Sequence, residues 1–390
     1  MKRIVMAKGG VETLEFFSYQ MAKTFEKKGY SVCYFDLQNE IESAQKLRKF
    51  IRQKETAFVT FNFEGLEKEK GIYKEGIGYI WDEYQIPCYN IVVDHPYYYH
   101  NRLKDLPKKY HHISIDGKQA AYFKAFYPEY DHLGFLPLAG TPIAPSGLEM
   151  DQGLASMDVI LTGNFTPTSF CESYIYRINE EYAAFYMGII EDLIAFPEKT
   201  VEEVAIAHCK REMGEISRDD MRLMMHNMIF IDMYVRNYWR GEVVKSLVNA
   251  GINVDVFGKG WDKLDCKKPE YLHIHSQTSS LDCLRQISRA KLSLNVMPWF
   301  KDGAHDRVFN SILNGTISLT DKSEYLCREL NQGESVWYYD LKDLDKLPEL
   351  AWNLLKDEQT RQQILGKGLD KVSTYHTWEA RAEQLIQWFE

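Results

Sequence analysis

Several familiar sequence patterns are missing from this chain, and each absence excludes a class of function. There is no Walker A motif, and no GxGxxG pattern follows the first predicted strand, where Gly9-Gly10 lacks a third glycine. ATPase and dinucleotide-dependent dehydrogenase functions are therefore disfavoured. No run of about twenty apolar residues occurs, so we expect no membrane-spanning segment. The apolar run near the N-terminus is too short for a signal peptide, which predicts a cytoplasmic protein and leaves peripheral membrane contact open.

Metal-binding and disulfide patterns are also missing. The seven cysteines are scattered, none forms CxxC, and an odd count does not suit a disulfide framework. His273 and His275 alternate along one predicted strand, and His111 and His112 lie at another, but no partner stands at a metal-ligand spacing. We interpret these histidines as strand-face residues, and we predict reduced cysteines and no metal site.

A surplus of positive charge is absent as well. The net charge is −9 and no block of like charges occurs, which argues against nucleic acid as a partner. A small basic cluster at residues 104–109 keeps contact with an anionic surface open. Aromatic residues make up 14% of the chain; some could stack on a sugar or nucleoside, but we expect most of them in the core.

The chain does contain a regular alternation of predicted strands and helices. In the first half, short apolar segments alternate with segments of helical periodicity, which predicts a parallel sheet with helices on both faces. The second half repeats this pattern, with a mainly helical insertion over residues 173–250 after its first strand. The predicted strands are residues 3–8, 31–36, 57–62, 88–93, 112–115 and 133–138 in the first half, and residues 158–162, 253–257, 271–275, 291–295, 316–320 and 336–339 in the second.

A segment without periodicity separates the two halves, at residues 139–158, and it contains proline, glycine and serine. A length of 390 residues also favours two domains. We therefore predict an α/β fold with one domain at residues 1–150 and a second at residues 151–375. The expected helices include residues 77–84, 174–195, 219–249 (with a break allowed) and 358–365.

The segment from Asn295 to Asp321 concentrates polar groups between two strands that must both be buried. A polar, glycine-containing loop follows the first strand, a helix begins at about Arg307, and Asn314-Gly315 ends it. In open α/β sheets, a loop of this kind at the carboxyl end of a strand binds anions, because the following helix presents unpaired N–H groups. The segment therefore predicts an anion site.

Three strand ends in the second half carry turns of this type: Gly163-Asn164, Gly258-Lys259-Gly260, and the loop from Asn295 to Arg307. Because the carboxyl ends of parallel strands share one edge of a sheet, these turns can converge on one ligand. Small residues, backbone N–H groups and the cations Lys259 and Arg307 suit a diphosphate. The alternative for Arg307 is a structural ion pair with Asp302 or Asp306.

In the first half, Asp94 and His95 stand where a strand ends, followed by Pro96 and three tyrosines. A carboxylate beside an imidazole at such a position could act as general base toward an acceptor hydroxyl. The alternative is that Asp94 caps a helix and the tyrosines pack in the core. The residues alone do not decide between these two interpretations.

With these residues in view, the second half resembles CgeB-like (spore-maturation type) group-1 glycosyltransferases. The likeness runs from about Asp158 to the end, while the first half shares only its strand–helix rhythm and the Asp94-His95-Pro96 turn. The similar segments are residues 258–261, 291–295, 305–309, 314–315, 320–321, 338–340 and 376–378, together with Arg381.

The resemblance implies a GT-B architecture, in which two Rossmann-like domains face a cleft and a C-terminal helix, residues 376–390, packs back on the N-terminal domain. It implies a metal-independent transferase without a cofactor. The donor is a nucleoside diphosphate sugar, expected to be UDP-linked, and the acceptor is a hydroxyl of a protein, glycan or small molecule. The donor-binding residues would be Gly163, Asn164, Gly258, Lys259, Gly260, Asn295, Asp302, Gly303, His305, Arg307 and Asn310, and the catalytic residues Asp94, His95 and Arg307.

One departure from the family pattern affects the predicted site. Retaining group-1 enzymes carry two glutamates eight positions apart, and these positions hold Asp302 and Asn310 in this chain. Asn310 can bond a ribose hydroxyl, but more weakly than a carboxylate. Two other functions therefore stay open: a non-catalytic sugar-nucleotide-binding partner in a glycosylation complex, and a sugar-nucleotide epimerase of the same fold.

Overall fold

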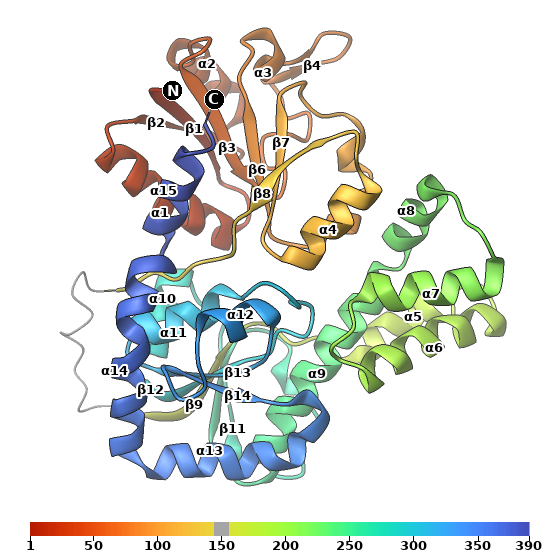
Figure 1. Cartoon of the computed structure of the whole chain (residues 1–390), viewed down its shortest axis with the longest axis vertical. Helices are drawn as coiled ribbons and strands as arrows, with labels where there is room; N and C mark the ends of the chain where they lie inside the picture. Colours follow the sequence, from red (N-terminus) through yellow and green to blue (C-terminus); the bar gives the residue numbers. More distant parts are fainter. Residues whose placement is uncertain (144–155, 390) are drawn as a thin grey trace. The chain divides into compact units, whose positions relative to one another are not determined.

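The computed structural model describes residues 1–143 and 156–389. The chain forms two compact units. The first comprises Met1–Leu138 with His376–Glu390, so both termini belong to it (Figure 1), and the second comprises Ala139–Tyr375. The domain boundary predicted between residues 150 and 151 lies outside the described residues.

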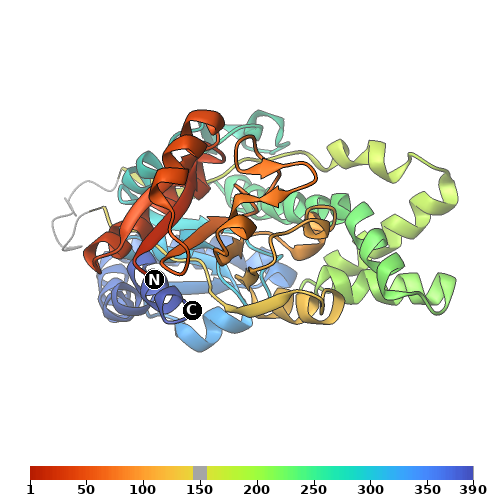
Figure 2. The same cartoon turned by 90° about the horizontal axis from the view of Figure 1, so that it is seen from above.

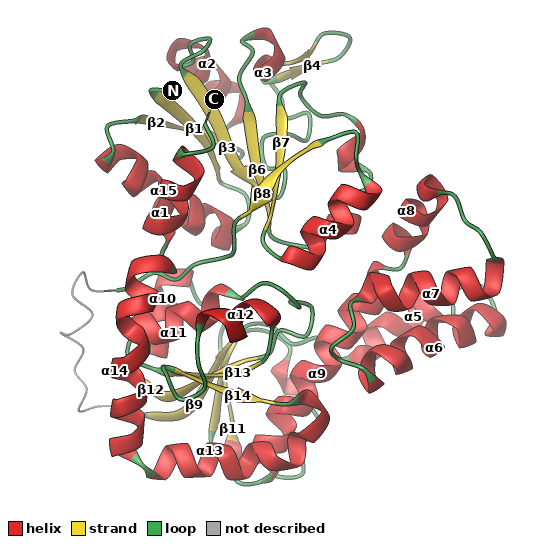
Figure 3. Ribbon diagram, in the orientation of Figure 1, coloured by secondary structure: helices red, strands yellow, loops and turns green. Residues whose placement is uncertain are grey.

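The first unit is built on a six-stranded parallel sheet with the strand order β2-β1-β3-β6-β7-β8. Its central strands are buried on both faces, as expected for apolar segments covered by helices on either side (Figure 3). The strands are β1 (Arg3–Lys8), β2 (Ser31–Asp36), β3 (Thr56–Phe61), β6 (Cys88–Val92), β7 (Tyr110–Ser114) and β8 (Asp131–Phe135).

The helices of the first unit are α1 (Glu12–Lys27), α2 (Glu40–Phe50), α3 (Ile80–Glu83) and α4 (Gly117–Phe126). The helix predicted at residues 77–84 is wrong in length, because only α3 is helical. The residues before α3 form a hairpin of β4 (Tyr73–Lys74) and β5 (Gly78–Tyr79). Gly76 and Gly78 have φ angles of +75° and +108°, which end any helix there.

The second unit contains another six-stranded parallel sheet, with the order β11-β10-β9-β12-β13-β14. In sequence rank this is the 3-2-1-4-5-6 order of a Rossmann fold, and the chain changes direction between β9 and β12. Ligands of such sheets bind beyond the carboxyl ends of the strands at that switch point. The strands are β9 (Met157–Thr162), β10 (Val254–Phe257), β11 (Leu272–His275), β12 (Ala290–Asn295), β13 (Ile317–Asp321) and β14 (Val336–Tyr339).

The helices that pack on this sheet include α9 (Ile229–Asn249), α10 (Ser280–Ile287), α11 (Asp306–Leu313) and α14 (Glu358–Tyr375). Helix α12 (Glu324–Glu329) follows β13, and α13 (Leu347–Lys356) packs against α9 and α14. The predicted end of α14 at residue 365 is wrong. Gly366 and Gly368 lie inside the helix, and a Cβ on Gly368 would stand 2.5 Å from Ser335 Oγ. Gly368 is therefore used for close packing and not as a helix stop.

Four helices form the insertion after β9: α5 (Glu172–Ile175), α6 (Glu180–Ala195), α7 (Val201–Met213) and α8 (Arg218–Asn227). They project to one side of the second sheet (Figures 1 and 2). The long helices predicted at residues 174–195 and 219–249 are each divided in two, the first before α6 and the second between α8 and α9. Asn179 starts α6, because its side chain accepts a hydrogen bond from the backbone N–H of Tyr182.

The last helix, α15 (Trp378–Ile386), packs against α1 in the first unit. The ring of Trp378 lies 4.4 Å from that of Phe17, and Trp378 is 3% exposed. Arg381 Nε donates to the carbonyl of Pro137 at 2.7 Å. Apolar burial and this hydrogen bond thus hold the C-terminal segment on the first unit.

We expect Trp378→Ala to lower the free energy of unfolding of the first unit by about 3–5 kcal/mol, because a large buried ring is removed from a packed contact. Urea unfolding followed by circular dichroism measures this change. The matched control is Ile41→Ala, at a 55%-exposed position of α2, which should cost about 0.5 kcal/mol or less. Similar losses in the two variants would contradict the packing role of Trp378.

Candidate active site

The turns that follow β9 and β10 lie in direct contact. The N–H of Gly163 donates to the carbonyl of Phe257, and the N–H of Phe165 donates to that of Lys259, both at 2.9 Å. A Cβ on Gly258 would stand 2.3 Å from the carbonyl oxygen of Gly163, so no other residue fits there without displacing the turn. The predicted convergence of these two glycine turns is therefore present in the structure.

Side-chain hydrogen bonds also connect the two turns. Asn164 Oδ1 accepts a hydrogen bond from the N–H of Lys259 at 2.8 Å. Trp261 is fully buried, and its Nε1 donates to the carbonyl of Gly163 at 2.8 Å. Asn164 and Lys259 are both exposed, so the turn presents an amide and a cation to solvent at this edge of the sheet.

Arg307 joins the third strand end to these turns. It stands in the first turn of α11 and is 7% exposed. Its Nη1 donates to Asn295 Oδ1 at 2.6 Å, and its Nε donates to Thr162 Oγ1 at 3.2 Å. Its Nη2 would lie 3.3 Å from a Cβ on Gly163, so glycine at that position leaves room for the guanidinium. The ends of β9, β10 and β12 thus meet around Arg307.

The alternative of a structural ion pair for Arg307 is not what the structure shows. Asp302 Oδ1 accepts from Arg328 Nη2 at 2.6 Å. Asp306 lies 2.6 Å from His305 Nδ1, and it also accepts from Asn310 Nδ2 at 2.9 Å. Among the described residues, no carboxylate lies within ion-pair distance of the Arg307 guanidinium. A buried guanidinium of this kind provides positive charge for an anionic ligand.

Two further arginines, which the sequence analysis missed, stand beside this site on α9. Arg240 Nη1 donates to the carbonyl of Asn164 at 2.6 Å. Burial, together with the charges of Arg307 and Arg236, lowers the pKa of Arg240. Arg236 is paired with Asp232 at 2.6 Å. Their i, i+4 spacing places both arginines on one face of a helix, and this was the sequence signal that could have revealed them.

The loop between β12 and α11 is fixed by hydrogen bonds to the start of α12 and the end of β13. The N–H of Met297 donates to Asp321 Oδ1 at 2.8 Å, and the N–H of Glu324 donates to the carbonyl of Lys301 at 2.7 Å. Ser323 Oγ donates to the carbonyl of Gly303 at 2.6 Å. The predicted residues Asp302, Gly303 and His305 therefore belong to a well-anchored loop next to Arg307.

Asn295 and Asn310 have protein partners for all of their side-chain polar atoms. Asn295 is fully buried, binds Arg307 through Oδ1 and donates to Thr320 Oγ1 at 2.8 Å, so it positions the arginine. Asn310 Oδ1 accepts from the N–H of Thr141 at 2.8 Å, while its Nδ2 donates to Asp306. A contact between Asn310 and a ribose stays a prediction.

In the first unit, Asp94 and His95 follow β6, as predicted. His95, and not Asp94, caps the short 3-10 helix Pro96–Tyr99, and its ring is 6% exposed among tyrosines. Asp94 is only half-buried. Its Oδ2 accepts from Asn62 Nδ2 at 3.1 Å and from the hydroxyl of Tyr99 at 2.9 Å. Of the two predicted bases, Asp94 is therefore the more accessible.

Asn62 is held in an unusual backbone conformation. Asn62 and Phe63 have φ angles of +45° and +68°, which are costly for residues other than glycine. This turn directs the Asn62 amide toward Asp94 and toward the N–H of Val93, which donates to Asn62 Oδ1 at 2.8 Å. Backbone strain is thus used to orient a group beside a candidate catalytic carboxylate.

The histidines singled out in the sequence have other partners. His275 Nε2 lies 2.7 Å from Asp255 Oδ1, and His273 Nε2 lies 3.0 Å from Asn253 Oδ1. Residues 1–143 and 156–389 contain no group of three or more His, Cys, Asp or Glu side chains arranged to hold a metal ion. No helix within the same residues is long and apolar enough to cross a bilayer.

Residues 239–387 match the model of a family described as glycosyl transferase-like. The matched region includes Arg240, Lys259 and Arg307, that is, the cations of the second unit described above. A comparison of the sequence with curated proteins gives no match.

Solved structures similar to this chain cover almost its whole length. Sucrose-phosphate synthase from Thermosynechococcus elongatus has a TM-score of 0.52 at 10% identity, over 99% of this chain and 98% of that one. HepE of Anabaena in complex with UDP-glucose has a TM-score of 0.52 at 11% identity, over 99% and 98% of the two chains. The DNA-modifying enzyme β-glucosyltransferase has a TM-score of 0.55 at 13% identity, over 100% and 99%.

The GT-B type of α/β fold is therefore confirmed. The match of residues 239–387 to a glycosyl transferase-like family supports the predicted enzyme class at that level. The CgeB-like subgroup and the roles of the individual site residues stay predictions.

We expect the stability of the second unit to depend on pH through Asp321, which is 3% exposed. Burial raises the pKa of Asp321 to about 7, against the opposing N–H of Met297 and the charge of Lys301. The folded protein therefore holds this proton to higher pH than the unfolded chain does. The stabilisation is complete below about pH 4 and is lost as the pH rises through 7.

From pH 5 to pH 8, this group should lower the free energy of unfolding by about 2–3 kcal/mol. Asp321→Asn keeps an acceptor for Met297 but cannot ionise, so the variant should lack this part of the pH dependence. Urea unfolding of both proteins at pH 5, 6.5 and 8 tests the assignment. Parallel pH profiles for the two proteins would show that Asp321 does not titrate in this range.

Proposed function

We propose that this protein is a glycosyltransferase that transfers a sugar from a nucleoside diphosphate sugar, with UDP as the expected nucleotide, to an acceptor hydroxyl. The observation that carries the proposal is Arg307, a buried guanidinium without a carboxylate partner among the described residues, at the switch point of a Rossmann-ordered sheet. A CgeB-like enzyme that acts without a metal ion in the cytoplasm is the specific form that the sequence resemblance supports.

The local charge favours a diphosphate over a singly charged anion. Arg307 and Arg240 have no ion-pair partner among the residues described, and the exposed Lys259 stands on the adjoining turn. The two arginines repel one another, which a ligand with two or more negative charges would relieve. The transferase leaves a nucleoside diphosphate as its product, and these cations would stabilise the charge that develops on it.

Arg307→Ala should weaken the binding of UDP by about 10- to 100-fold, because charge-assisted hydrogen bonds to phosphate are lost. Arg240→Gln should act in the same direction. Isothermal titration calorimetry measures both affinities. Uridine lacks the phosphates, so its affinity should change little in either variant.

The control for these variants is Arg285→Ala, which removes an exposed arginine of α10 that is paired with Asp282. It should bind UDP as the unchanged protein does. If Arg307→Ala binds UDP with unchanged affinity, the proposed diphosphate site is wrong. Loss of uridine and UDP binding together would instead indicate a general disruption of the second unit.

The acceptor would be activated by Asp94 in the first unit, provided that the reaction inverts the configuration of the sugar. Asp94 is half-buried, and its orientation is fixed by Asn62 and Tyr99. His95 has its ring packed between Tyr97 and Tyr122, which leaves it less accessible to a substrate. A retaining enzyme has less need of such a base.

Asp94→Asn should reduce the rate of sugar transfer by about 100-fold or more, because a general base typically contributes that much. The affinity for UDP should not change, since Asp94 belongs to the other unit. Release of UDP from UDP-sugars in the presence of an acceptor panel measures the rate, and Asp105→Asn, at an exposed aspartate paired with Lys68, is the control. Full activity of Asp94→Asn would exclude the residue as the base.

A non-catalytic sugar-nucleotide-binding protein is the second candidate, because one specific observation favours it. Asn310 stands where retaining relatives have a glutamate, and its side chain is bonded to Thr141 and Asp306. UDP binding that depends on Arg307, without transfer or hydrolysis of any UDP-sugar, would identify this function.

A further inference from the structure

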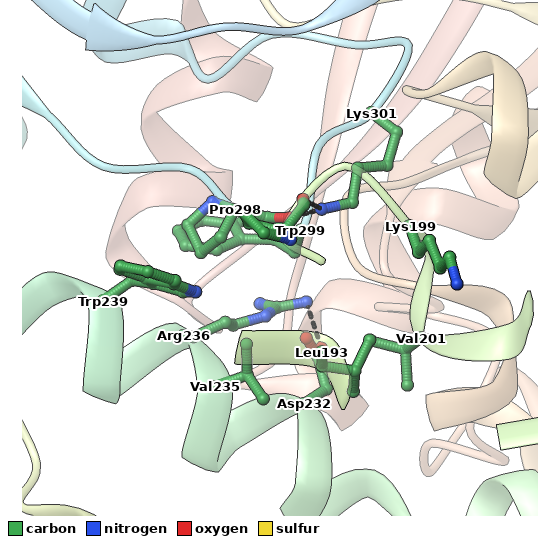
Figure 4. Close-up of a pocket in the computed structure, with 11 residues that line it drawn as sticks. Leu193, Lys199, Val201, Asp232, Val235, Arg236, Trp239, Pro298, Trp299 and Lys301 are labelled. Carbon is green, nitrogen blue, oxygen red and sulfur yellow. Dashed lines mark hydrogen bonds and ion pairs between the residues drawn. The ribbon is translucent and has the colours of Figure 1, made fainter. Parts of the chain in front are cut away.

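The second unit contains a pocket that the diphosphate site does not use. Its walls come from three segments: the α6–α7 part of the helical insertion, helix α9, and the loop that follows β12 (Figure 4). Lys301 of that loop donates to the carbonyl of Pro197 at 2.5 Å, which ties the loop to the insertion. The insertion therefore forms one wall of this small pocket.

The side chains around this pocket supply hydrogen-bond donors and positive charge. Lys199, Arg236 and Lys301 line it, while Asp232 is the single carboxylate in the lining. Asp232 is paired with Arg236 at 2.6 Å, so its charge is already balanced. The charged groups of the described lining thus carry a net positive charge.

The unbonded indole N–H of Trp239 is a second observation that indicates a ligand in this pocket. The residue is 6% exposed, and its Nε1 has no hydrogen-bond partner among the described residues. An indole N–H can only donate, and leaving it unbonded in the interior costs free energy. Figure 4 shows this nitrogen on the edge of the ring that faces Arg236 and Trp299. An acceptor oxygen in the pocket would satisfy it.

The pocket adjoins the proposed diphosphate site through two side chains. The Arg236 guanidinium lies 4.5 Å from the centre of the Trp299 ring, and that of Arg240 lies 5.7 Å from it. Arg240 also donates to the carbonyl of Asn164 in the turn after β9. A group that is covalently linked to a diphosphate at that turn is therefore close to the pocket.

We propose that this pocket binds the carboxylate of the donor sugar, so that the preferred donor is a nucleoside diphosphate hexuronate; this rests on the function proposed above. A carboxylate supplies both the acceptor oxygens that Trp239 requires and the negative charge that the lysines and Arg236 favour. The apolar side chain of Val235 lines the same pocket. The helical insertion, which supplies Lys199, then contributes to donor specificity.

The test compares the affinities of UDP, UDP-glucose and UDP-glucuronate for the full chain by isothermal titration calorimetry. We expect UDP-glucuronate to bind about tenfold or more tightly than UDP-glucose. Trp239→Phe removes the N–H donor together with part of the ring, and it should reduce this preference by about 3- to 10-fold, with the affinities for UDP and UDP-glucose nearly unchanged. The matched control is Trp337→Phe, which removes another buried and unbonded indole N–H, outside the pocket, and should change nothing.

Lys199→Gln, at an exposed position on the rim, is the second variant, and it should also reduce the preference for the uronate. Equal affinities for UDP-glucose and UDP-glucuronate, with UDP binding that still depends on Arg307, would overturn this inference and leave the proposed function intact. Absence of UDP binding altogether would overturn both. Binding of free glucuronate as tightly as UDP-glucuronate would assign the pocket to an acceptor and refute the donor assignment.

Discussion

The second unit depends on one constraint: the turns after β9 and β10 approach so closely that Gly258 has no room for a side chain. That contact fixes the carbonyl of Gly163 and the side chain of Asn164, and these groups in turn fix Trp261 and the Lys259 backbone. The space left beside Gly163 is filled by the guanidinium of Arg307. A cation buried in this way, with amide and hydroxyl oxygens as its partners, costs free energy until an anion arrives.

Helix α9 connects the two sites of the second unit. Arg240 binds the turn after β9 and lies near Trp299, while Arg236, one helical turn earlier, stacks on Trp299 and lines the pocket. A movement of this helix would therefore alter both regions together. The loop after β12 has the same double role, because Arg307 follows it and Lys301 belongs to it.

The sequence predicted the parts of this arrangement that follow from local rules. Apolar runs of strand length identified both parallel sheets, and the geometry of a parallel sheet brought the turns at Gly163 and Gly258 to one edge. The i, i+4 spacing of Arg236 and Arg240 puts both side chains on one helix face. That this face belongs to the site follows only from the packing of α9 beside the loop after β12. Gly368 misled the prediction of α14 for a similar reason, since its close contact with Ser335 is tertiary.

The segment Gly140–Ile143 has a consequence for exchanging domains between relatives. Asn310 of α11 and Asn314, which follows that helix, accept from the N–H groups of Thr141 and Ile143. A Cβ on Gly140 would stand 2.7 Å from the backbone of Phe309. These contacts make Gly140–Ile143 part of the second unit, although the segment follows directly on the last strand of the first unit in the sequence. A hybrid of two relatives should therefore be joined before Ala139, so that Gly140–Ile143 stays with the helix that carries Arg307. Its second junction should follow Tyr375, so that the C-terminal helix stays with the first unit.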